Sequence, residues 1–539
     1  MPLANQHPVR FAPKGLSDAY DSTEAFSGAC RSLVNLVFDQ GNPELVICRP
    51  GVGTALTTFA SFTTPTFISV YIAIGSVVYG MIASGRNAGH DEPFAYDVNA
   101  AAFIAISGIT SGNTPTSPAT TGAWIPPSMT VVGKKIILAH TGFSGAAGVF
   151  FGVLDISTPG APAWSSANLA TNLLPTVPTV VANLNNRCYF ACGNVAYYSD
   201  SLNPTVATSA GQSLTCGDPS MIYGMSGLPV STTAAGVVQA LLIFKEFQIW
   251  QVTGDSATSN LALNYLSLNV GTKAGRSVVQ TPLGTYFMAV DGPYFVDAQG
   301  VVRPLTKDPA GEKEQDIQIP FIYAQQPTRV AAGYSGGVYR ICVDTLLNSA
   351  LTTSDYWFDT QKQRWNGPHT WPLDCMTQMG NYFIVSHRTT GAALYKSQLF
   401  PDSNTLYNDN GVAMSFNLLS STFPKDGSMT EKQIVESTIE LSSAGAAVAY
   451  QITLYDEQQT TLNSITLLVP ARGAIWGAFN WATANWSSNL NIPHVYTVPW
   501  TGPIVFQKVA LGVAGVASNN IAIGSFFARY QDTGYTNAQ

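Results

Sequence analysis

Short apolar runs joined by tight turns dominate this 539-residue chain. The stretch GTYFMAVDGPYFVDAQGVV, at 284–302, holds three such runs, and Asp291-Gly292 separates the first two. Asp-Gly between apolar runs is a strong hairpin signal, because both central residues of a type I′ turn need a positive φ. The stretch therefore predicts a three-stranded meander with two apolar faces, on which Val290 and Phe295 are buried by other layers.

The same strand–turn–strand unit recurs, with irregular spacing, through the middle of the chain. It is found at 67–79, 131–139 with 149–154, 187–198, 240–252, 285–305, 337–344 with 356–365, and 381–395. Two units share an aspartate at a strand end and a tryptophan after the next turn, namely Asp155 with Trp164 and Asp359 with Trp365. Meanders that cannot bury their own faces are typical of a β-propeller, in which each blade covers its neighbours. We therefore predict an all-β fold with a propeller of six or seven blades over 61–400.

The two ends of the chain differ from this repeat. From residue 434 onward, segments such as IVESTIELSS and AYQITLYD alternate between apolar and polar residues, as half-exposed antiparallel strands do. Four tryptophans crowd into 25 positions, which suits a sandwich core or a packed interface: Trp476, Trp481, Trp486 and Trp500. We predict a C-terminal β-sandwich domain over 401–539 and, over 1–60, an N-terminal arm or extra strands.

Charged residues make up only 11% of the chain, against roughly 25% in an ordinary soluble protein. Solubility then rests on Ser, Thr, Asn and Gln, or much of the surface is covered in an assembly. The net charge is −7 and Lys and Arg form no block, which argues against a sequence-reading nucleic-acid protein. The uncharged segment 67–84 is long enough for a membrane span, but its β-branched residues and the Gly75-Ser76 break favour a hairpin. We expect no membrane-spanning segment.

Seven cysteines are spread along the chain without a Cys-x-x-Cys pair. An odd number argues against a complete disulfide framework and favours the buried free thiols of a protein made in a reducing cytoplasm. Cys188 and Cys192 lie four apart on an expected strand and so share one face, where core packing is favoured over metal binding. The first 15 residues have no apolar core, so we expect no signal peptide.

Sequence motifs for catalysis lack the context that they need. Ser335 lies in a Gly-x-Ser-x-Gly match, but a strand rather than a helix follows it, so we expect a hairpin turn there. The segment GTKAGRS at 271–277 resembles a phosphate loop only in composition, because it lacks the Gly-Lys-Ser/Thr ending. The six histidines are scattered, and we interpret His90-Asp91-Glu92 as a solvated loop.

The carboxylates do not indicate a site either. Asp402, Asn404 and Leu406, in the polar linker 401–411, break the alternation that a calcium loop needs, so turn chemistry is expected. A glycosidase needs two carboxylates that flank the scissile bond, and the sparse acidic residues cannot be paired from their spacing. The repeated Ser-x-Asp-x-Gly-x-Thr-Trp box of sialidases is absent. We therefore predict no catalytic residue, no metal ligand and no cofactor, and expect that the chain is not an enzyme.

An ordered series of segments resembles one protein family. The series runs from NRCYFACGNVAYYSD at 186–200 through LLIFKEFQIWQVTGD at 241–255 and GTKAGRS to TPLGTYFMAVDGPYFVDAQG. Near the two ends of the chain lie RSLVNLVFDQGNPELVICRPGVG, at 31–53, and IGSFFARYQDTGY, at 523–535. This pattern resembles the tail nozzle, or packaged-DNA stabilisation, proteins of short-tailed bacteriophages. The clear match covers about half of the chain, mainly 186–345, and consists of turns and strands rather than reactive groups.

The resemblance implies a six-fold ring, a hexamer, built around β-propellers and docked below the portal and adaptor. Such a ring retains the packaged genome and forms the conduit for its ejection. The implied partners are sister subunits, the portal–adaptor ring, tail fibre or tail needle proteins, and double-stranded DNA that passes without sequence recognition. The implied location is the virion tail, after assembly in the host cytoplasm. The alternative is a receptor- or carbohydrate-binding tail protein, that is, an adhesin or depolymerase propeller.

Overall fold

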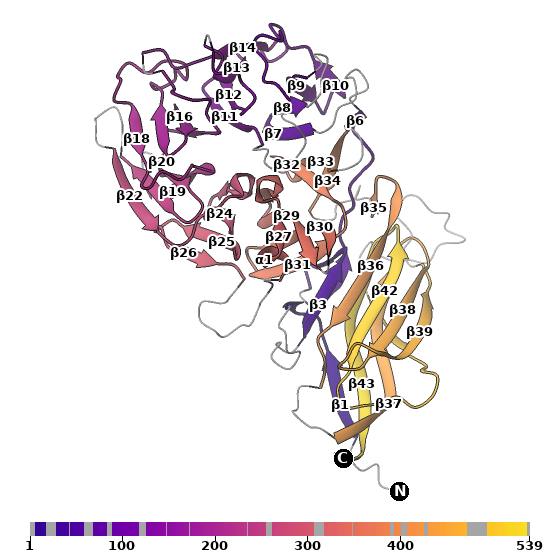
Figure 1. The fold of residues 1–539 in the computed structure, drawn as a ribbon. Helices are drawn as coiled ribbons and strands as arrows, with labels where there is room; N and C mark the ends of the chain where they lie inside the picture. Colours follow the sequence, from indigo (N-terminus) through magenta and orange to yellow (C-terminus); the bar gives the residue numbers. More distant parts are fainter. Residues whose placement is uncertain are drawn as a thin grey trace.

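The computed structural model consists almost entirely of β-strands. It describes residues 6–17, 28–42, 44–58, 68–82, 89–117, 126–146, 148–171, 173–233, 236–254, 261–306, 317, 319–347, 349–388, 393–399, 407–424, 430–471 and 493–535. A disc of short sheets, seen nearly face-on in Figure 1, stands on an elongated domain at whose far end both termini lie. The helical elements are short: α1 (Ile319–Ile322), η2 (Gly275–Ser277) and η3 (Pro327–Arg329).

Seven sheets form the disc, and each is one blade of a β-propeller. This number settles the predicted choice between six and seven blades. Blade 1 contains β7 (Ile68–Ile74), β8 (Val77–Ile82), β9 (Glu92–Asp97) and β10 (Ala102–Ile104). Blade 2 contains β11 (Ser128–Val132), β12 (Lys135–Ala139), β13 (Phe151–Asp155) and β14 (Ala163–Ala167). Blade 3 contains β15 (Val180–Leu184), β16 (Arg187–Cys192), β17 (Val195–Tyr198) and β18 (Ser213–Thr215). Blade 4 contains β19 (Gly224–Thr233), β20 (Gly236–Phe244), β21 (Ile249–Thr253) and β22 (Ala262–Ser267).

The last three blades follow the same meander with local additions. Blade 5 contains β23 (Val279–Thr281), β24 (Gly284–Ala289), β25 (Gly292–Asp297) and β26 (Val302–Pro304). Blade 6 contains β27 (Ala324–Gln325), β28 (Ala331–Ser335), β29 (Val338–Leu347), β30 (Ala350–Asp359) and β31 (Arg364–His369). Blade 7 contains β32 (Leu373–Met379), β33 (Tyr382–His387) and β34 (Ala393–Gln398), and its outer strand β6 (Thr57–Thr58) comes from the N-terminal segment. Strand β32 packs beside β7, which closes the ring.

The meander of blade 5 is confirmed, but its first turn lies one residue earlier than predicted. Ala289 pairs with Gly292, so Val290 and Asp291 form the turn, and neither has a positive φ. Gly292 instead has a φ of 142° at the start of β25. Val290 is therefore 60% exposed, and the prediction that it is buried is wrong.

A repeated aspartate turn explains why an aspartate at a strand end and a tryptophan after the next turn recur in the blades. In each case the carboxylate accepts a hydrogen bond from the backbone N–H two residues later, which closes an Asx turn after the third strand of the blade. The pairs are Asp97 with Asn99, Asp155 with Ser157, Asp297 with Gln299, and Asp359 with Gln361, at 2.9–3.0 Å. Hydrogen bonds, chiefly from Ala100 to Asp97 and from Ser157 to Asp155, lower the pKa of these two carboxyl groups. The turn directs the chain into the fourth strand, where Trp164 and Trp365 are buried.

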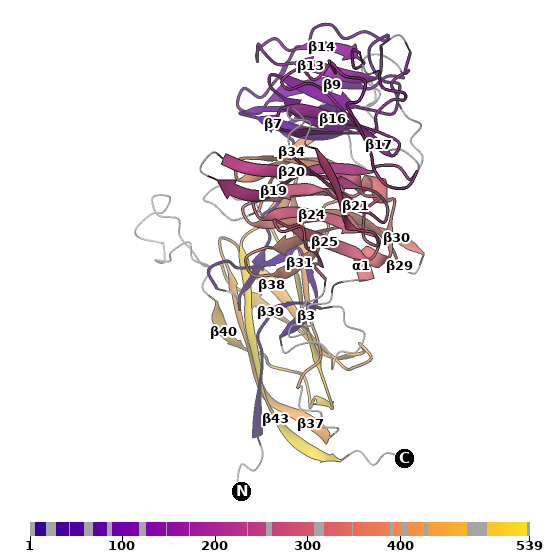
Figure 2. The same ribbon diagram turned by 90° about the vertical axis from the view of Figure 1, so that its left-hand side faces the viewer.

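The elongated domain consists of two sheets that include strands from both ends of the chain, a β-sandwich (Figure 2). One sheet contains β4 (Leu36–Phe38), β5 (Val46–Cys48), β43 (Ile521–Tyr535), β37 (Thr430–Ser443) and β40 (His494–Thr497), with β1 (Gln6–Phe11) on β43 and β41 (Val505–Phe506) on β37. The other contains β2 (Gly15–Leu16), β3 (Ala29–Val34), β36 (Val412–Ser420), β42 (Ala510–Ala517), β38 (Val448–Tyr455) and β39 (Thr461–Val469), with β35 (Asn408–Asp409) on β36.

The sandwich and the propeller share one apolar core. A continuous cluster of buried side chains joins Phe416 and Tyr450 of the sandwich to Tyr286 of blade 5 and Tyr339 of blade 6. Tyr286 and Tyr339 stack with ring centroids 4.9 Å apart. Burying this apolar surface stabilises the junction by roughly 25 cal/mol per Å². The two parts are therefore held against each other by packing as well as by the chain.

Buried ion pairs lie on both sides of this junction, Arg49 with Asp409 in the sandwich and Arg340 with Asp355 in blade 6. Arg49, just after β5, donates to both carboxylate oxygens of Asp409, at 3.1 and 2.5 Å, and to the side chain of Asn35 at 3.0 Å. Nearby, the fully buried Arg340 donates from Nε to Asp355 Oδ2 at 2.8 Å. His369 is buried between these cations, and burial followed by repulsion from Arg49 and Arg340 lowers its pKa well below the ordinary value. Asp409, in the segment 401–411 that the sequence predicts as a polar linker, is thus the partner of a buried arginine.

Other sequence-based expectations have mixed outcomes. Segment 67–84 forms the β7–β8 hairpin in its described part, and no helix among the described residues is long and apolar enough to cross a membrane. Cys188 and Cys192 both pack in the core between blades 2 and 3, as predicted. The solvated-loop interpretation of 90–92 is wrong, because Asp91 and Glu92 are buried and Asp91 Oδ2 lies 2.8 Å from Nε2 of the buried His140. Asp402, Asn404, Leu406, Trp476, Trp481 and Trp486 lie outside the described residues.

Candidate functional site

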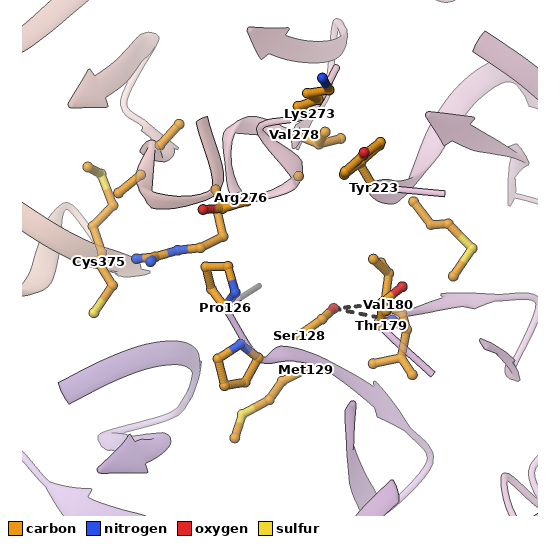
Figure 3. A pocket seen from close by; sticks show the side chains of 18 residues that line it. Pro126, Ser128, Met129, Thr179, Val180, Tyr223, Lys273, Arg276, Val278 and Cys375 are labelled. Carbon is orange, nitrogen blue, oxygen red and sulfur yellow. Dashed lines mark hydrogen bonds between the residues drawn. The ribbon is translucent and has the colours of Figure 1, made fainter. Parts of the chain in front are cut away.

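The centre of the propeller encloses a cavity of about 240 Å³ (Figure 3). Its walls come from the beginnings of the inner strands of blades 2 to 7, including β11, β15, β19 and β28. Ser128 lies on this wall, where its hydroxyl joins β11 to β15 by hydrogen bonds with the backbone of Val181, at 3.2 and 3.3 Å. We call this central space the axial channel; its lining combines apolar residues such as Met129 and Val180 with polar and charged ones.

The connection between blades 4 and 5 places two cations at this channel. It is the segment GTKAGRS, and it packs so tightly that a Cβ on Gly271 would lie 2.1 Å from the Lys245 carbonyl. A Cβ on Gly275 would lie 1.9 Å from the Tyr223 carbonyl. Only glycine fits at these close backbone approaches. The glycines that make this segment look like a phosphate loop are thus explained by close packing. The same segment places Lys273 and Arg276 on the channel wall.

Both cations are engaged by neighbouring groups. Lys273 Nζ lies 2.7 Å from Glu246 Oε1, and this hydrogen bond raises the pKa of Lys273. Arg276 donates from its guanidinium to the backbone carbonyl of Asp374. Because each cation already has an acceptor, the channel offers an incoming anion less attraction than two free cations would.

Behind Arg276, two buried carboxylates share one arginine. Arg388 contacts Asp344 and lies 3.8 Å from Asp374, and Arg329 also approaches Asp374, at 3.3 Å. Arg388 further donates to the Arg329 carbonyl at 2.7 Å. Asp344 and Asp374 are 3% and 1% exposed, so the cluster fastens blade 6 to blade 7 beneath the channel wall.

The axial channel widens on the side of blades 2 to 5. This wider section, which we call the amide section, has a volume of about 560 Å³ and shares Met129, Val181 and Met225 with the narrower cavity. Its polar groups are carboxamides and hydroxyls: Thr130, Asn183, Asn185, Asn186, Ser226, Gln239 and Gln280. None of the described residues that line it carries a formal charge.

The sequence motif around Ser335 is a hairpin turn, as predicted. Ser335 ends β28 and pairs with Val338 across Gly336 and Gly337, which both have positive φ. The side chain is buried, with its Oγ 3.4 Å from the Gly380 carbonyl. Within the described part of the chain, no group of three or more His, Cys, Asp and Glu side chains is placed to hold a metal ion.

A second candidate surface lies on the sandwich, away from the channel. The outward side chains of β36, β42, β38 and β39 form two rows across the sheet: Ser415, Val516, Ala449 and Leu468, and then Asn417, Ala514, Gln451 and Thr466. We call these residues the uncharged face. Leu468 is 71% exposed and Val516 is 60% exposed. The opposite sheet differs, because its strands β1, β37 and β43 carry exposed ionised side chains such as Arg10, Glu436 and Arg529.

The uncharged face was not recognised from the sequence, although a signal for it exists. The segments VAMSFNLLS, VAYQITLY, TLNSITLLV and ALGVAGVA contain no Asp, Glu, Lys or Arg. Each segment alone has the pattern of an ordinary half-buried strand. Only the pairing of the four strands shows that their uncharged outward residues form one surface.

Comparisons with known proteins show no family for this chain. No family model matches the chain, and no curated protein matches it. Among solved structures, a GH32 β-fructofuranosidase from Bombyx mori is 8% identical with a TM-score of 0.26, over 90% of this chain and 94% of that one. A GH43 arabinoxylan arabinofuranohydrolase from Bacillus subtilis is 11% identical with a TM-score of 0.25, over 89% and 99%. A putative 6-phosphogluconolactonase from Bacteroides uniformis is 12% identical with a TM-score of 0.33, over 61% and 93%.

One sequence-based prediction is corrected by these neighbours. The chain was expected not to be an enzyme, yet glycoside hydrolases of two families align along about nine-tenths of it. The prediction that the chain is not an enzyme is therefore not kept. TM-scores of 0.25 and 0.26 transfer neither an activity nor a substrate to this chain. The strand pairing establishes that the chain contains a seven-bladed β-propeller, and its function has to be argued from its own surfaces.

Proposed function

We propose that the protein is the subunit of a ring-shaped tail nozzle that retains packaged DNA and conducts it during ejection. In this proposal six copies form the ring below a portal–adaptor connector, and the sandwich and propeller are its two structural layers. The ordered segments across 186–345, which resemble nozzle proteins, support the choice of ring. The protein then belongs to the tail of a short-tailed virion, together with tail fibre or needle proteins.

The observation that carries the proposal is the uncharged face. A sheet exposed to water usually carries ionised side chains, because they keep its surface soluble and prevent association. Here two rows across four strands have none, and Leu468 and Val516 are exposed among them. Exposed apolar groups within an uncharged surface are typical of a contact between proteins. We assign this face to the contact with the next subunit of the ring.

A charge placed on this face is expected to prevent ring formation without unfolding the subunit. Leu468→Glu would bury an unpaired carboxylate between subunits, whereas Val435→Glu, at a 49% exposed position of the opposite sheet, is the matched control. Negative-stain electron microscopy is expected to show rings for the wild type and for Val435→Glu, and single subunits for Leu468→Glu. Far-ultraviolet circular dichroism should be the same for all three proteins, because the subunit stays folded in each. Rings formed by Leu468→Glu would remove the uncharged face from the proposed contact.

Assembled rings are expected to bind duplex DNA weakly, with a shallow dependence on salt. The chain has 25 Lys and Arg against 32 Asp and Glu, so few cations are available to release counterions from the phosphates. Fluorescence anisotropy titrations between about 50 and 200 mM salt measure both affinity and slope. Tight binding that falls steeply as salt rises would reveal a concentrated basic surface and would contradict a conduit through which DNA slides.

A further inference from the structure

The amide section of the axial channel is built from four different blades. Asn183 comes from β15, the inner strand of blade 3, and Asn186 from the turn that follows this strand. Gln239 lies on β20 of blade 4, and Gln280 on β23 of blade 5. Thr130 on β11 adds a hydroxyl group from blade 2. Side chains far apart in the sequence thus converge on one space of about 560 Å³.

Two details show that the packing around this space is specific. A Cβ on Gly227 would lie 2.8 Å from Gln280 Oε1 and 3.1 Å from its Nε2, so the glycine leaves room for that carboxamide. Asn183 donates from Nδ2 to the Val131 carbonyl at 2.6 Å, which fixes its orientation. Its Oδ1 is buried and has no hydrogen-bond partner among the described residues. A buried acceptor without a partner is costly, so the packing around Asn183 holds this carboxamide in place at an energetic cost.

The chemistry of the lining restricts the class of ligand. A carboxamide both donates and accepts hydrogen bonds, as does a hydroxyl group, so the two match over several positions. An anion such as phosphate needs cations or clustered backbone N–H groups, and no Lys or Arg is among the described residues that line this section. A nucleobase is usually held by stacking on an aromatic ring, and the described lining contains no aromatic side chain. Met129, Val131 and Met225 supply an apolar surface for C–H groups.

We propose that the amide section is a binding site for a neutral polyhydroxylated ligand, that is, a saccharide. Sugar hydroxyls would take the hydrogen bonds of Asn183, Asn186, Gln239 and Gln280, while the C–H face of the ring lies on the methionine and valine side chains. A volume of about 560 Å³ lies within the range of small-molecule pockets. The site belongs to the single subunit, because the residues that form it come from one propeller, and it does not depend on the proposed ring.

Isothermal titration calorimetry with the full-length protein tests this site. The probes are glucose, galactose, mannose, N-acetylglucosamine and their disaccharides, with inorganic phosphate and dAMP as probes of the other ligand classes. Gln280→Met removes one exposed carboxamide at nearly constant length, and Gln361→Met does the same on an outer turn of blade 6. We expect at least one saccharide to bind, about ten-fold more weakly to Gln280→Met and unchanged to Gln361→Met.

Three results would overturn the proposal. They are the absence of heat from every saccharide at millimolar concentration, an equal affinity of the two Gln→Met variants, and binding of phosphate or dAMP in preference to every saccharide. The Leu468→Glu variant separates this site from the ring. Saccharide binding retained by its single subunits would support the site whether or not the wild type forms rings, and rings without saccharide binding would reject only the site.

Discussion

Phe287→Asp is expected to abolish folding, whereas Val290→Asp, three residues later in the same hairpin, is expected to leave it intact. Phe287 is fully buried between blades 4 and 5, with its ring centroid 5.0 Å from that of Phe244 and 5.8 Å from that of Tyr294. An unpaired carboxylate at this place costs several kcal/mol, comparable to the whole stability of a domain. Val290 is in the turn and 60% exposed, so a charge there stays hydrated.

Soluble yield and circular dichroism of the two variants measure this difference. The wild-type spectrum should be reproduced by Val290→Asp, while Phe287→Asp should appear in the insoluble fraction. Because the two positions differ by three residues, expression conditions and local sequence are nearly matched. Native-like, soluble Phe287→Asp would mean that blades 4 and 5 do not pack as described.

Asp355→Ala is expected to destabilise the protein by about 3–5 kcal/mol, because it leaves Arg340 buried without its partner. Both side chains are completely buried, and Asp355 Oδ2 also accepts a hydrogen bond from Trp357 Nε1 at 2.8 Å. The substitution therefore orphans a cation and an indole N–H in the same place. Urea denaturation followed by tryptophan fluorescence gives the change in the unfolding midpoint.

Two further variants show whether the loss comes from the orphaned charge. The double variant Arg340→Met with Asp355→Leu removes both charges and is expected to regain much of the lost stability. Glu436→Ala breaks an exposed ion pair, in which the side chain of Glu436 is 55% and that of Arg529 is 62% exposed. It should barely change the urea midpoint of unfolding. A double variant as unstable as Asp355→Ala would show that altered packing, and not the orphaned charge, causes the destabilisation.

The repeated meanders could be predicted from the sequence because their signals are local. Apolar runs and short turns specify a hairpin within about 20 residues, and the aspartates at 155 and 359 act on backbone groups two residues away. The prediction places the turn at Asp291-Gly292, because an Asp-Gly pair fits more than one strand register. The structure has the turn at Val290-Asp291, because Ala289 pairs with Gly292. Local patterns thus identify blades more reliably than they place turns.

The candidate sites could not be predicted because they depend on long-range packing. Asp91 looks solvated beside other polar residues, yet it contacts His140, which is 49 residues away. Asn183 and Gln280 are unremarkable in their own strands, and only the closure of the ring brings them to one channel. No spacing rule connects strands of different blades, since the intervals between blades are irregular. The uncharged face could be recognised only from the strand order of the sandwich, for the same reason.

The return of the chain to its starting point sets the order of events during synthesis. Strands β1 and β5 pair with β43, and β3 pairs with β36, so these early strands leave the ribosome long before their partners. At roughly 5–20 residues per second, that interval is on the order of half a minute or more. The seven blades emerge meanwhile, and the outer strand of the seventh, Thr57–Thr58, has been in solution since the beginning. A nascent chain stalled before β36 would therefore expose unpaired N-terminal strands, which makes this stage the one most in need of a chaperone.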